Sequence, residues 1–385
     1  MPRHAAIDVD LDAITANTRA VAAAAPHSIV CAVVKADGYG HGAVPVARAA
    51  LAGGAGWLAV ALVEEGHELR RAGIDAPVLV LSEPPPDVMP EALEARLTPT
   101  LYTDAGIDAA IAAVRAAGEK AWAVHLKVDT GMHRVGADPS DVLGLASRIV
   151  AAPELVLQGT FTHLAVADEP ERGETAEQLD RFESVLAELS RSGIEPGLRH
   201  AANSAGILAH PRAHYDLVRA GIALYGLAPA PALAGRIELR PAMRVRAEVT
   251  TVRSLRAGDG ASYGLRHVFD RPAKVAVVPL GYADGVARRL GLTGGCVLIG
   301  GVRCPVRGVV TMDQTIVEVT EAPEVSPGDE VVLLGPQGDD EITAQEWADR
   351  LDTIGYEVVC GFSARLPRRH LGAAAPRVVA PEGAG

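Results

Sequence analysis

The sequence has little cysteine, no long apolar run and no surplus of positive charge. Its four cysteines are Cys31, Cys296, Cys304 and Cys360, and none of them forms a CxxC pair. Neither a zinc site nor a disulfide framework is therefore expected, and no metal site is predicted. We interpret Cys304 and Cys360 as small core residues rather than nucleophiles.

The other two absences limit the location and the partners of the protein. No run of about 18 apolar residues is present, which argues against a transmembrane helix. Asp8, Asp10 and Asp12 stand where a signal peptide would need a basic and then an apolar region. The formal net charge of -12 argues against nucleic acid as a main partner. We therefore expect a soluble, cytoplasmic protein that acts on a small molecule.

The N-terminal part of the sequence alternates short β-type runs with Ala-rich amphipathic stretches such as 103–118 and 173–193. The β-type runs are 28–36, 57–62, 77–82, 97–102, 122–129, 155–164, 198–203 and 217–226. Eight strands with intervening helices over roughly 200 residues predict a (β/α)8 barrel. A doubly wound open sheet is the structural alternative.

After residue 235 the sequence becomes rich in β-type runs separated by Gly and Pro turns, with helical character in 343–351 alone. This change predicts a second, mostly β domain. We place the barrel at 11–235 and the β domain at 236–385. The alternating residues 1–10 are expected to add a strand to either domain.

Polar residues recur at the expected carboxyl ends of the barrel strands, where the chemistry of such barrels is found. They are Lys35, Lys127, Arg134, His163, Ser204 and Arg219. A lysine that loses its hydration at a barrel mouth can have a lowered pKa and form a Schiff base with a carbonyl. From its position alone, Lys35 is equally well explained as a solvated lysine.

The loops after the seventh and eighth strands are suited to bind a phosphate group. They offer the Ser204 hydroxyl and the backbone amides of Gly221 and Ile222, and glycine lets the backbone approach a ligand closely. Each glycine alone would be explained by a turn. Together, a lysine, an arginine and a phosphate site at one rim indicate pyridoxal 5'-phosphate.

Motifs along nearly the whole chain resemble those of the alanine racemases, in the same order and spacing. They are AVVKADGYGHG, KVDTGMHRVG, FTHLA, HAANSAG, VRAGIALYG, ASYGLRHVF, GYADG, VVTMDQ and GYEVVCGFSARLPR. The resemblance implies an isomerase that interconverts L- and D-alanine through a pyridoxal phosphate aldimine with two bases. It also implies a homodimer with composite active sites, and D-alanine destined for peptidoglycan.

The resemblance also implies roles for individual residues. Lys35 matches the Schiff-base lysine, which is one of the two catalytic bases, and Tyr263 matches the second base, which reaches the other subunit's cofactor. Arg219 matches the residue that faces the pyridine nitrogen. The residues that match cofactor ligands are Lys35, Tyr39, His163, Asn203, Ser204, Arg219, Gly221, Ile222 and Tyr356.

The substrate side of the site follows from the same resemblance. Arg134 and Met312 match residues that bind the substrate carboxylate, and Lys127 matches a lysine that is often carbamylated and then pairs with the arginine. His133 stands where many relatives have glycine, and Thr311 where many have cysteine. Both departures lie near the expected substrate.

Three alternatives remain at this stage. The chain could be a racemase of the same fold that acts on serine or other small amino acids, or a decarboxylase. It could also be a non-catalytic pyridoxal phosphate carrier, although such carriers lack a second domain. His41 is interpreted as a loop residue bonded to the backbone.

Overall fold

The computed structural model describes residues 4–322 and 324–373 and divides into two compact units. The barrel unit comprises Ala13–Gly38 and Ala43–Arg240. The C-terminal unit comprises the described parts of 1–12, 39–42 and 241–385. The predicted boundaries place 11–12 and 39–42 in the barrel and 236–240 in the β domain, whereas the contacts group each of these with the other unit. The predicted domains also include 1–3, 323 and 374–385, which lie outside the described residues. No helix within 4–322 or 324–373 is long and apolar enough to cross a membrane.

The barrel unit is built on one parallel sheet of eight strands, in the order β8-β7-β6-β5-β4-β3-β2-β9. The two end strands are joined because the amides of Asp216 and Arg219 donate to the carbonyls of Arg199 and Ala202, at 3.1 and 3.0 Å. The predicted (β/α)8 fold is therefore confirmed. The strands are β2 (Ile29–Val33), β3 (Trp57–Val60), β4 (Val78–Val80), β5 (Thr98–Leu101), β6 (Trp122–Lys127), β7 (Leu155–Phe161), β8 (Leu198–His200) and β9 (Leu217–Ala220).

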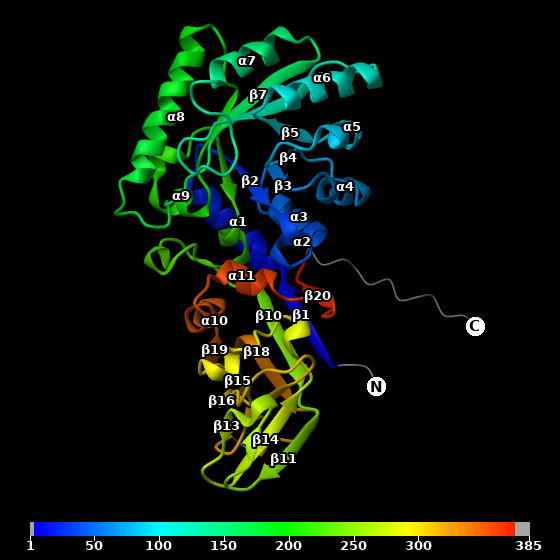
Figure 1. Cartoon of the computed structure of the whole chain (residues 1–385), viewed down its shortest axis with the longest axis vertical. Coiled ribbons are helices and arrows are strands. Elements are labelled where there is room, and N and C mark those ends of the chain that lie inside the picture. The colour runs from blue at the N-terminus through cyan, green and yellow to red at the C-terminus, as the bar shows by residue number, and fades with distance from the viewer. Residues whose placement is uncertain (1–3, 323, 374–385) are drawn as a thin grey trace, which may run out of the picture. The chain divides into compact units, whose positions relative to one another are not determined.

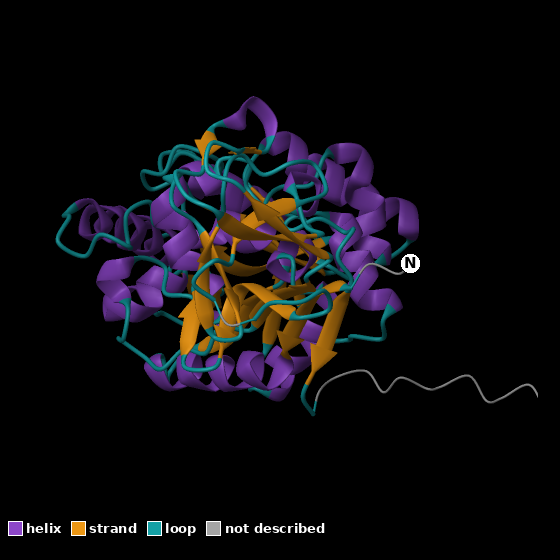
Figure 2. Ribbon diagram, turned by 90° about the horizontal axis from the view of Figure 1, so that it is seen from below, coloured by secondary structure: helices purple, strands orange, loops and turns teal. Residues whose placement is uncertain are grey.

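Helices surround these strands, as the cartoon and the ribbon view show (Figures 1 and 2). They are α1 (Leu11–Ala24), α3 (Ala43–Ala52), α4 (Val63–Arg71), α5 (Met89–Glu94), α6 (Asp104–Ala117), α7 (Val142–Ala151), α8 (Glu174–Arg191) and α9 (Ser204–Ala209). In α8 the side chains of Leu179, Phe182, Leu186 and Leu189 are buried at intervals of three and four. This spacing gives the helix one apolar face, which packs inward. The central strands are buried on both faces, as expected for a parallel sheet covered by helices.

The C-terminal unit contains a larger sheet in the order β16-β15-β18-β10-β1-β20, with β19 beside β18. The N-terminal strand β1 belongs to this sheet, antiparallel to β10 and parallel to β20. The strands are β1 (Ala5–Asp10), β10 (Met243–Glu248), β15 (Cys296–Ile299), β16 (Val302–Pro305), β18 (Glu330–Gln337), β19 (Asp340–Ile342) and β20 (Arg368–Leu371).

Two smaller sheets and two helices complete this unit. One sheet has the order β11-β14-β17, formed by β11 (Thr251–Leu255), β14 (Ala273–Val278) and β17 (Thr315–Glu318). The other pairs β12 (Gly260–Ala261) with β13 (His267–Val268). Helix α10 (Ala344–Leu351) lies within the predicted helical stretch, whereas α11 (Gly355–Cys360) was not predicted. Its glycine and two valines have weak helix propensity, which hid it in the sequence.

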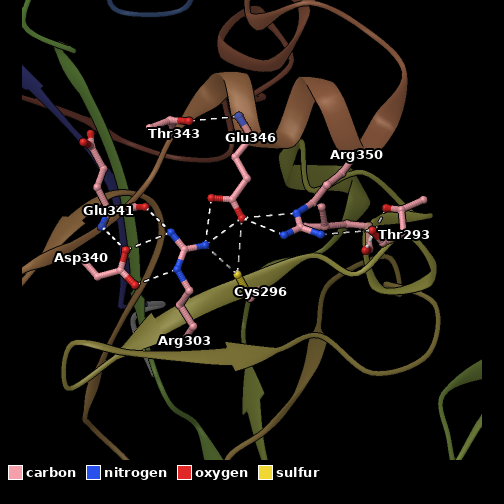
Figure 3. Close-up of polar contacts among 9 residues, drawn as sticks. Thr293, Cys296, Arg303, Asp340, Glu341, Thr343, Glu346 and Arg350 are labelled. Carbon is pink, nitrogen blue, oxygen red and sulfur yellow. Dashed lines mark hydrogen bonds and ion pairs between the residues drawn. The ribbon is translucent and has the colours of Figure 1, made fainter.

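A network of charged side chains joins β16, β19 and α10 (Figure 3). Arg303 binds the Asp340 carboxylate through Nε and Nη2, at 2.7 and 2.9 Å, and the Glu346 carboxylate through Nη1, at 2.9 Å. Arg350 binds the same Glu346 at 3.1 Å. The Sγ atom of Cys296 lies 3.5 Å from Arg303 Nη1, so this thiol is part of a structural cluster.

Candidate active site

Lys35 begins a turn in which the backbone is left-handed. Strand β2 ends at Val33, and α2 (Lys35–Tyr39) then carries Ala36, Asp37 and Gly38 at φ between 51° and 59°. Such a conformation costs a residue with a side chain about 1–2 kcal/mol. Glu65 helps to hold it, because its carboxylate accepts a hydrogen bond from the Ala36 amide at 2.6 Å. The lysine therefore stands at a strained turn at the carboxyl end of a barrel strand, where strain often accompanies function.

Arg219, on β9, is a buried cation in the barrel interior. Its Nη2 lies 2.8 and 2.9 Å from the carbonyls of Thr162 and Ala201 and 3.1 Å from His163 Nδ1, and its Nη1 donates to His200 Nδ1 at 2.7 Å. No carboxylate among the described residues pairs with it, and burial lowers the pKa of the guanidinium to about 10. The group therefore stays protonated at neutral pH, and its Nε–H has no acceptor in the described part of the chain.

Lys127 ends β6, and its ammonium group lies among other cations. Its side chain is buried, donates to the Leu81 carbonyl at 3.2 Å and lies over the Phe161 ring. Burial and then the charges of Arg219, Arg134 and Lys35 lower the pKa of Lys127 to about 7. A large part of this amine is thus uncharged near neutrality, which is the form that reacts with carbon dioxide.

His163 lies two residues beyond the end of β7 and is half-buried. Burial, the adjacent Arg219 and other cations hold the pKa of this histidine well below its usual range. The guanidinium group of Arg219 has hydrogen-bond donors and no acceptors. Neutral His163 therefore accepts at Nδ1 and carries its hydrogen on Nε2. A supporting role of His163 for Arg219 requires this contact, and the role itself stays a prediction.

The expected phosphate loops come together at the start of α9. The Ser204 hydroxyl oxygen accepts from the amides of Gly221 and Ala223, at 2.9 and 3.3 Å. Asn203 caps the helix, because its side chain accepts from the Gly206 amide at 2.9 Å. The Ser204 hydroxyl hydrogen and the Ile222 amide are buried and have no acceptor among the described residues. These free donors fit an anionic ligand with several acceptor oxygens.

The loop after β6 carries Arg134 and His133, both exposed. The Asp129 carboxylate accepts from the amides of Gly131, Met132 and His133, each at 3.0 Å, and so fixes the loop. His133 has φ of 56°, a left-handed conformation that glycine adopts at little cost. This conformation explains physically why glycine suits the position.

In the C-terminal unit, the segment 39–42 brings Tyr39 beside Tyr356, with ring centroids 6.3 Å apart. Burial raises the pKa of Tyr39 strongly, and Tyr356 and Cys360 add to this. His41 Nδ1 donates to the Tyr39 carbonyl at 2.9 Å, as its interpretation as a backbone-bonded loop residue required. Arg368 Nε donates to the Gly40 carbonyl at 3.0 Å, which fastens the segment to this unit.

Tyr263 and Met312 are exposed in the isolated chain, with 73% and 52% of their surface accessible. Tyr263 follows Ser262, whose hydroxyl donates to the Val309 carbonyl at 2.6 Å. Met312 lies in a tight turn in which Thr311 Oγ1 donates to the Gln314 carbonyl at 2.9 Å and accepts from the Gln314 amide at 3.2 Å. The Thr311 hydroxyl is therefore used within the turn.

Some expectations need correction, and some residues were missed. Cys304 is buried as predicted, but Cys360 is exposed, because it is the last residue of the unpredicted helix α11. Sequence reasoning did not single out Glu65, His125 or His200. The two histidines lie in strands where apolar residues are the norm, and a polar residue in such a run is a signal that could have found them. Within the described ranges, no three His, Cys, Asp or Glu side chains are grouped as metal ligands.

The residues present fit pyridoxal phosphate. Lys35 supplies an amine, Arg219 a buried cation with a free Nε–H, and Ser204 and Ile222 two buried donors without acceptors. All four belong to the barrel unit. An aromatic nitrogen and a phosphate are acceptors that would satisfy these donors.

Comparison with known proteins identifies the family of this chain. A model of the alanine racemase N-terminal domain matches residues 9–229, and a model of the alanine racemase C-terminal domain matches 242–370. The alanine racemase of Symbiobacterium thermophilum is 51% identical over 94% of this chain and 95% of its own length. That of Thermobifida fusca is 46% identical over 97% of this chain and 100% of its own length.

A solved structure agrees with this result. The crystal structure of alanine racemase from D-cycloserine-producing Streptomyces lavendulae has a TM-score of 0.91 and 40% identity, with coverage of 97% of this chain and 98% of that one. The chain therefore belongs to the alanine racemase family and is a pyridoxal phosphate-dependent isomerase that interconverts L- and D-alanine.

Proposed function

We propose that Lys35 and Tyr263 are the two bases of the racemisation, and that Tyr263 is supplied by the partner subunit of a homodimer. Racemisation requires a proton to leave one face of the α-carbon and another to arrive on the opposite face. Two bases on opposite sides meet this requirement. When bound, pyridoxal phosphate supplies the electron-withdrawing group that acidifies the α-proton.

The observation that supports the cofactor, on which the two-base proposal depends, is a buried cation without a carboxylate beside two donors that lack acceptors in the described part of the barrel unit. Arg219 is buried without a carboxylate partner, and the Ser204 hydroxyl and Ile222 amide lack acceptors among the described residues. Buried polar groups without partners cost about 1–3 kcal/mol each. Such a set is expected where a ligand provides the missing acceptors.

Each remaining residue has a proposed task. Arg219 donates to the pyridine nitrogen, and its permanent charge disfavours a proton there, which limits leakage into transamination. Ser204, Gly221 and Ile222 bind the phosphate, and Asn203 holds the start of α9 in place. Tyr39 and Tyr356 are proposed as further phosphate ligands, and His163 as the support of Arg219.

The substrate carboxylate is proposed to bind Arg134 and the Met312 amide of the partner subunit. The pKa of Lys127, lowered to about 7, supports its proposed carbamylation. In that reaction the neutral amine attacks carbon dioxide, a C–N bond forms as one C=O π bond breaks and its electron pair moves onto oxygen, and the nitrogen loses a proton to solvent. The carbamate places a negative charge among Arg134, Arg219 and Lys35, where it is favourable.

Alanine is favoured over serine as the substrate. A hydroxyl at position 311 could favour polar substrates, but the Thr311 hydroxyl already donates and accepts within its own turn. Its single O–H is therefore used within the turn and does not donate to a serine side chain. We further propose that the enzyme works in the cytoplasm and that its D-alanine serves peptidoglycan synthesis, in keeping with the resemblance.

The shared site can be tested by complementation. Tyr263→Phe removes the proton acceptor and keeps the ring, so the variant should fold and bind cofactor while racemisation falls by about 10²–10⁴-fold. Lys35→Ala should be inactive for the same reason. Mixed under conditions of subunit exchange, the two variants form heterodimers in which one site has both bases and the other has neither.

Chiral separation of alanine after incubation of the mixture with L-alanine and pyridoxal phosphate gives the measurement. Recovery of a sizeable fraction of wild-type activity supports the composite site. No recovery after exchange has been verified by mass spectrometry, or a fully active monomer, would place both bases in one chain.

A further inference from the structure

The barrel interior holds a pair of buried histidines, His125 on β6 and His200 on β8, that the racemisation steps above do not use. Both are fully buried. His125 Nδ1 lies 2.9 Å from His200 Nε2, and His200 Nδ1 accepts from Arg219 Nη1 at 2.7 Å. A polar residue in a barrel core is costly unless it has a partner, so the pair calls for an explanation.

We propose that His125 is a positioning residue that holds Arg219 in place through His200, as part of a one-way chain of hydrogen bonds from Arg219 through His200 and His125 to Gln158. The proposal rests on the proposed role of Arg219 as the donor to the pyridine nitrogen. It adds the residues that orient that donor from inside the barrel.

The direction of the chain follows from the chemistry of its first member. A guanidinium group has donors alone, so His200 Nδ1 must be an acceptor without a hydrogen. Neutral His200 then carries its hydrogen on Nε2 and donates to His125 Nδ1. His125 in turn carries its hydrogen on Nε2. Burial and the charge of Arg219 lower the pKa of both rings, to about 3 for His125, which keeps them neutral.

The end of the chain explains two orphaned atoms. His125 Nε2 and Gln158 Oε1 are both buried and without a hydrogen-bond partner of good geometry among the described residues. Gln158 is nevertheless near enough to raise the pKa of His125, against the larger lowering by burial. A donor at His125 Nε2 and an acceptor at Gln158 Oε1 satisfy each other after a small adjustment of either side chain.

The backbone makes room for this arrangement. The pairing of β6 with β7 shifts its register between Val124 and His125. A Cβ atom at Gly159 on β7 would lie 2.7 Å from His125 Cε1 and 2.9 Å from its Nδ1. The glycine and the irregular register therefore leave the space in which the ring can reach His200.

Phe161 on β7 fixes the other two members. Its ring stacks on His200 with centroids 4.4 Å apart and an interplanar angle of 7°, and Arg219 lies over the same ring at 5.1 Å. His200 is thus limited to motion in the plane of its ring, where His125 and Arg219 hold its two nitrogens. Loss of the His125 acceptor would free His200 to move its hydrogen to Nδ1, which would then face the Arg219 donor.

The direct test is to measure the tautomers in the wild-type holoenzyme. Solid-state NMR of protein labelled with ¹⁵N-histidine should show, for the two signals lost in His125→Phe and His200→Phe, a hydrogen on Nε2 and none on Nδ1. A hydrogen on Nδ1 of either ring, or a charged ring, at neutral pH would overturn the proposal. This measurement does not depend on activity.

The functional arm compares matched variants of the holoenzyme. His125→Phe keeps a ring but removes the acceptor, and we expect cofactor affinity and kcat to fall by about tenfold, with KM for alanine little changed. His125→Asn places an oxygen near the position of Nδ1 and should recover part of the loss. His214→Phe is the control, because His214 is half-buried and bonds through Nε2 to the Ile207 carbonyl at 3.0 Å.

Arg219→Gln separates failure of this proposal from failure of the proposed function. If Arg219→Gln weakens cofactor binding and His125→Phe does not, the chain is not a positioning device, although Arg219 keeps its role. If neither variant changes cofactor affinity, the role of Arg219 is wrong and the proposal fails with it. If His125→Phe does not fold, loss of affinity in folded His125→Asn relative to His214→Phe supports the proposal, and unchanged affinity overturns it.

Discussion

The two units differ in how they place their positive charges. In the barrel unit Arg219 and Lys127 are buried, have no carboxylate partner among the described residues, and have lowered pKa values of about 10 and 7. In the C-terminal unit Arg303 binds two carboxylates, which raise its pKa, and Arg307 binds Glu318 at 2.7 Å. Unpaired buried cations destabilise a fold, whereas paired ones add modestly to stability.

This difference indicates that the barrel unit is destabilised by charges that are placed to bind ligands. The buried cations Arg219 and Lys127 of the barrel unit are placed for acceptors that the ligands bring, while Arg303 and Arg307 of the C-terminal unit are paired within the chain. Removal of a buried, unpaired cation from the barrel unit should therefore raise stability, and removal of a paired cation from the C-terminal unit should lower it. Two experiments test this difference, beginning with the larger expected effect, and a third concerns a neutral hydroxyl of the C-terminal unit.

Lys127→Met should stabilise the protein near neutral pH and lose this advantage as the pH rises. The pKa of Lys127 is about 7 in the folded chain, against 10.5 for an ordinary lysine. Above pH 7 the unfolded state therefore binds the extra proton, and the stability of the wild type rises with pH. From about pH 7 to pH 9 we expect the variant's advantage to shrink by about 2–3 kcal/mol.

Urea unfolding in buffers free of carbon dioxide, so that no carbamate forms, measures this effect. Lys120→Met is the control, because Lys120 is exposed. Equal pH dependence in the wild type and Lys127→Met would show that the amine is not held at a lowered pKa. Racemase activity of the variant should fall, since Arg134 loses its proposed partner.

Arg303→Gln should change the stability of the protein in the opposite direction and by a smaller amount. It removes the centre of the network that joins β16, β19 and α10 (Figure 3). Because the Arg303 side chain is 38% exposed, solvent screens part of the interaction. We expect a loss of about 1 kcal/mol, or roughly 2–4 °C in Tm, that diminishes at high salt.

Calorimetry of Arg303→Gln beside Arg240→Gln checks this expectation. The pair of Arg240 with Glu238 is highly exposed, with 65% and 79% of the two side chains accessible. A fall in Tm for Arg240→Gln as large as that for Arg303→Gln would mean that the network stabilises the fold no more than an exposed ion pair does. Cofactor binding should be unchanged in both variants.

Thr311→Val changes an exposed turn of the C-terminal unit. Of the three substitutions, it should have the smallest effect, which we expect on substrate binding. The substitution keeps the shape of the side chain and removes both hydrogen bonds within the turn that carries Met312. We expect KM for alanine to rise by about 2- to 10-fold, in line with about 0.5–1.5 kcal/mol for a lost hydrogen bond. The ratio of serine to alanine turnover should stay constant, and a fall in that ratio would show that the hydroxyl contacts substrate.

Much of the fold could be predicted from the sequence because its signals are local. The barrel strands are apolar runs buried on both faces, and the helices between them carry apolar residues at intervals of three and four. Helix α11 escaped notice because a glycine and two valines gave no local signal. The assignment of 39–42 to the C-terminal unit was missed because it depends on contacts with residues more than 300 positions away, such as Arg368.

The sequence by itself determined the kinds of residues at the barrel's strand ends and their resemblance to one enzyme family, because both are properties of order and spacing. Tertiary structure alone decided which charges are buried and which are paired. The lowered pKa of Lys127 arises from burial and from the charges of Arg219 and Arg134. Arg219 lies far from Lys127 in the sequence, and Arg134 lies in the loop that follows β6. The chain from Arg219 to His125 likewise joins three strands, and no local pattern can encode contacts that form when those strands close into a barrel.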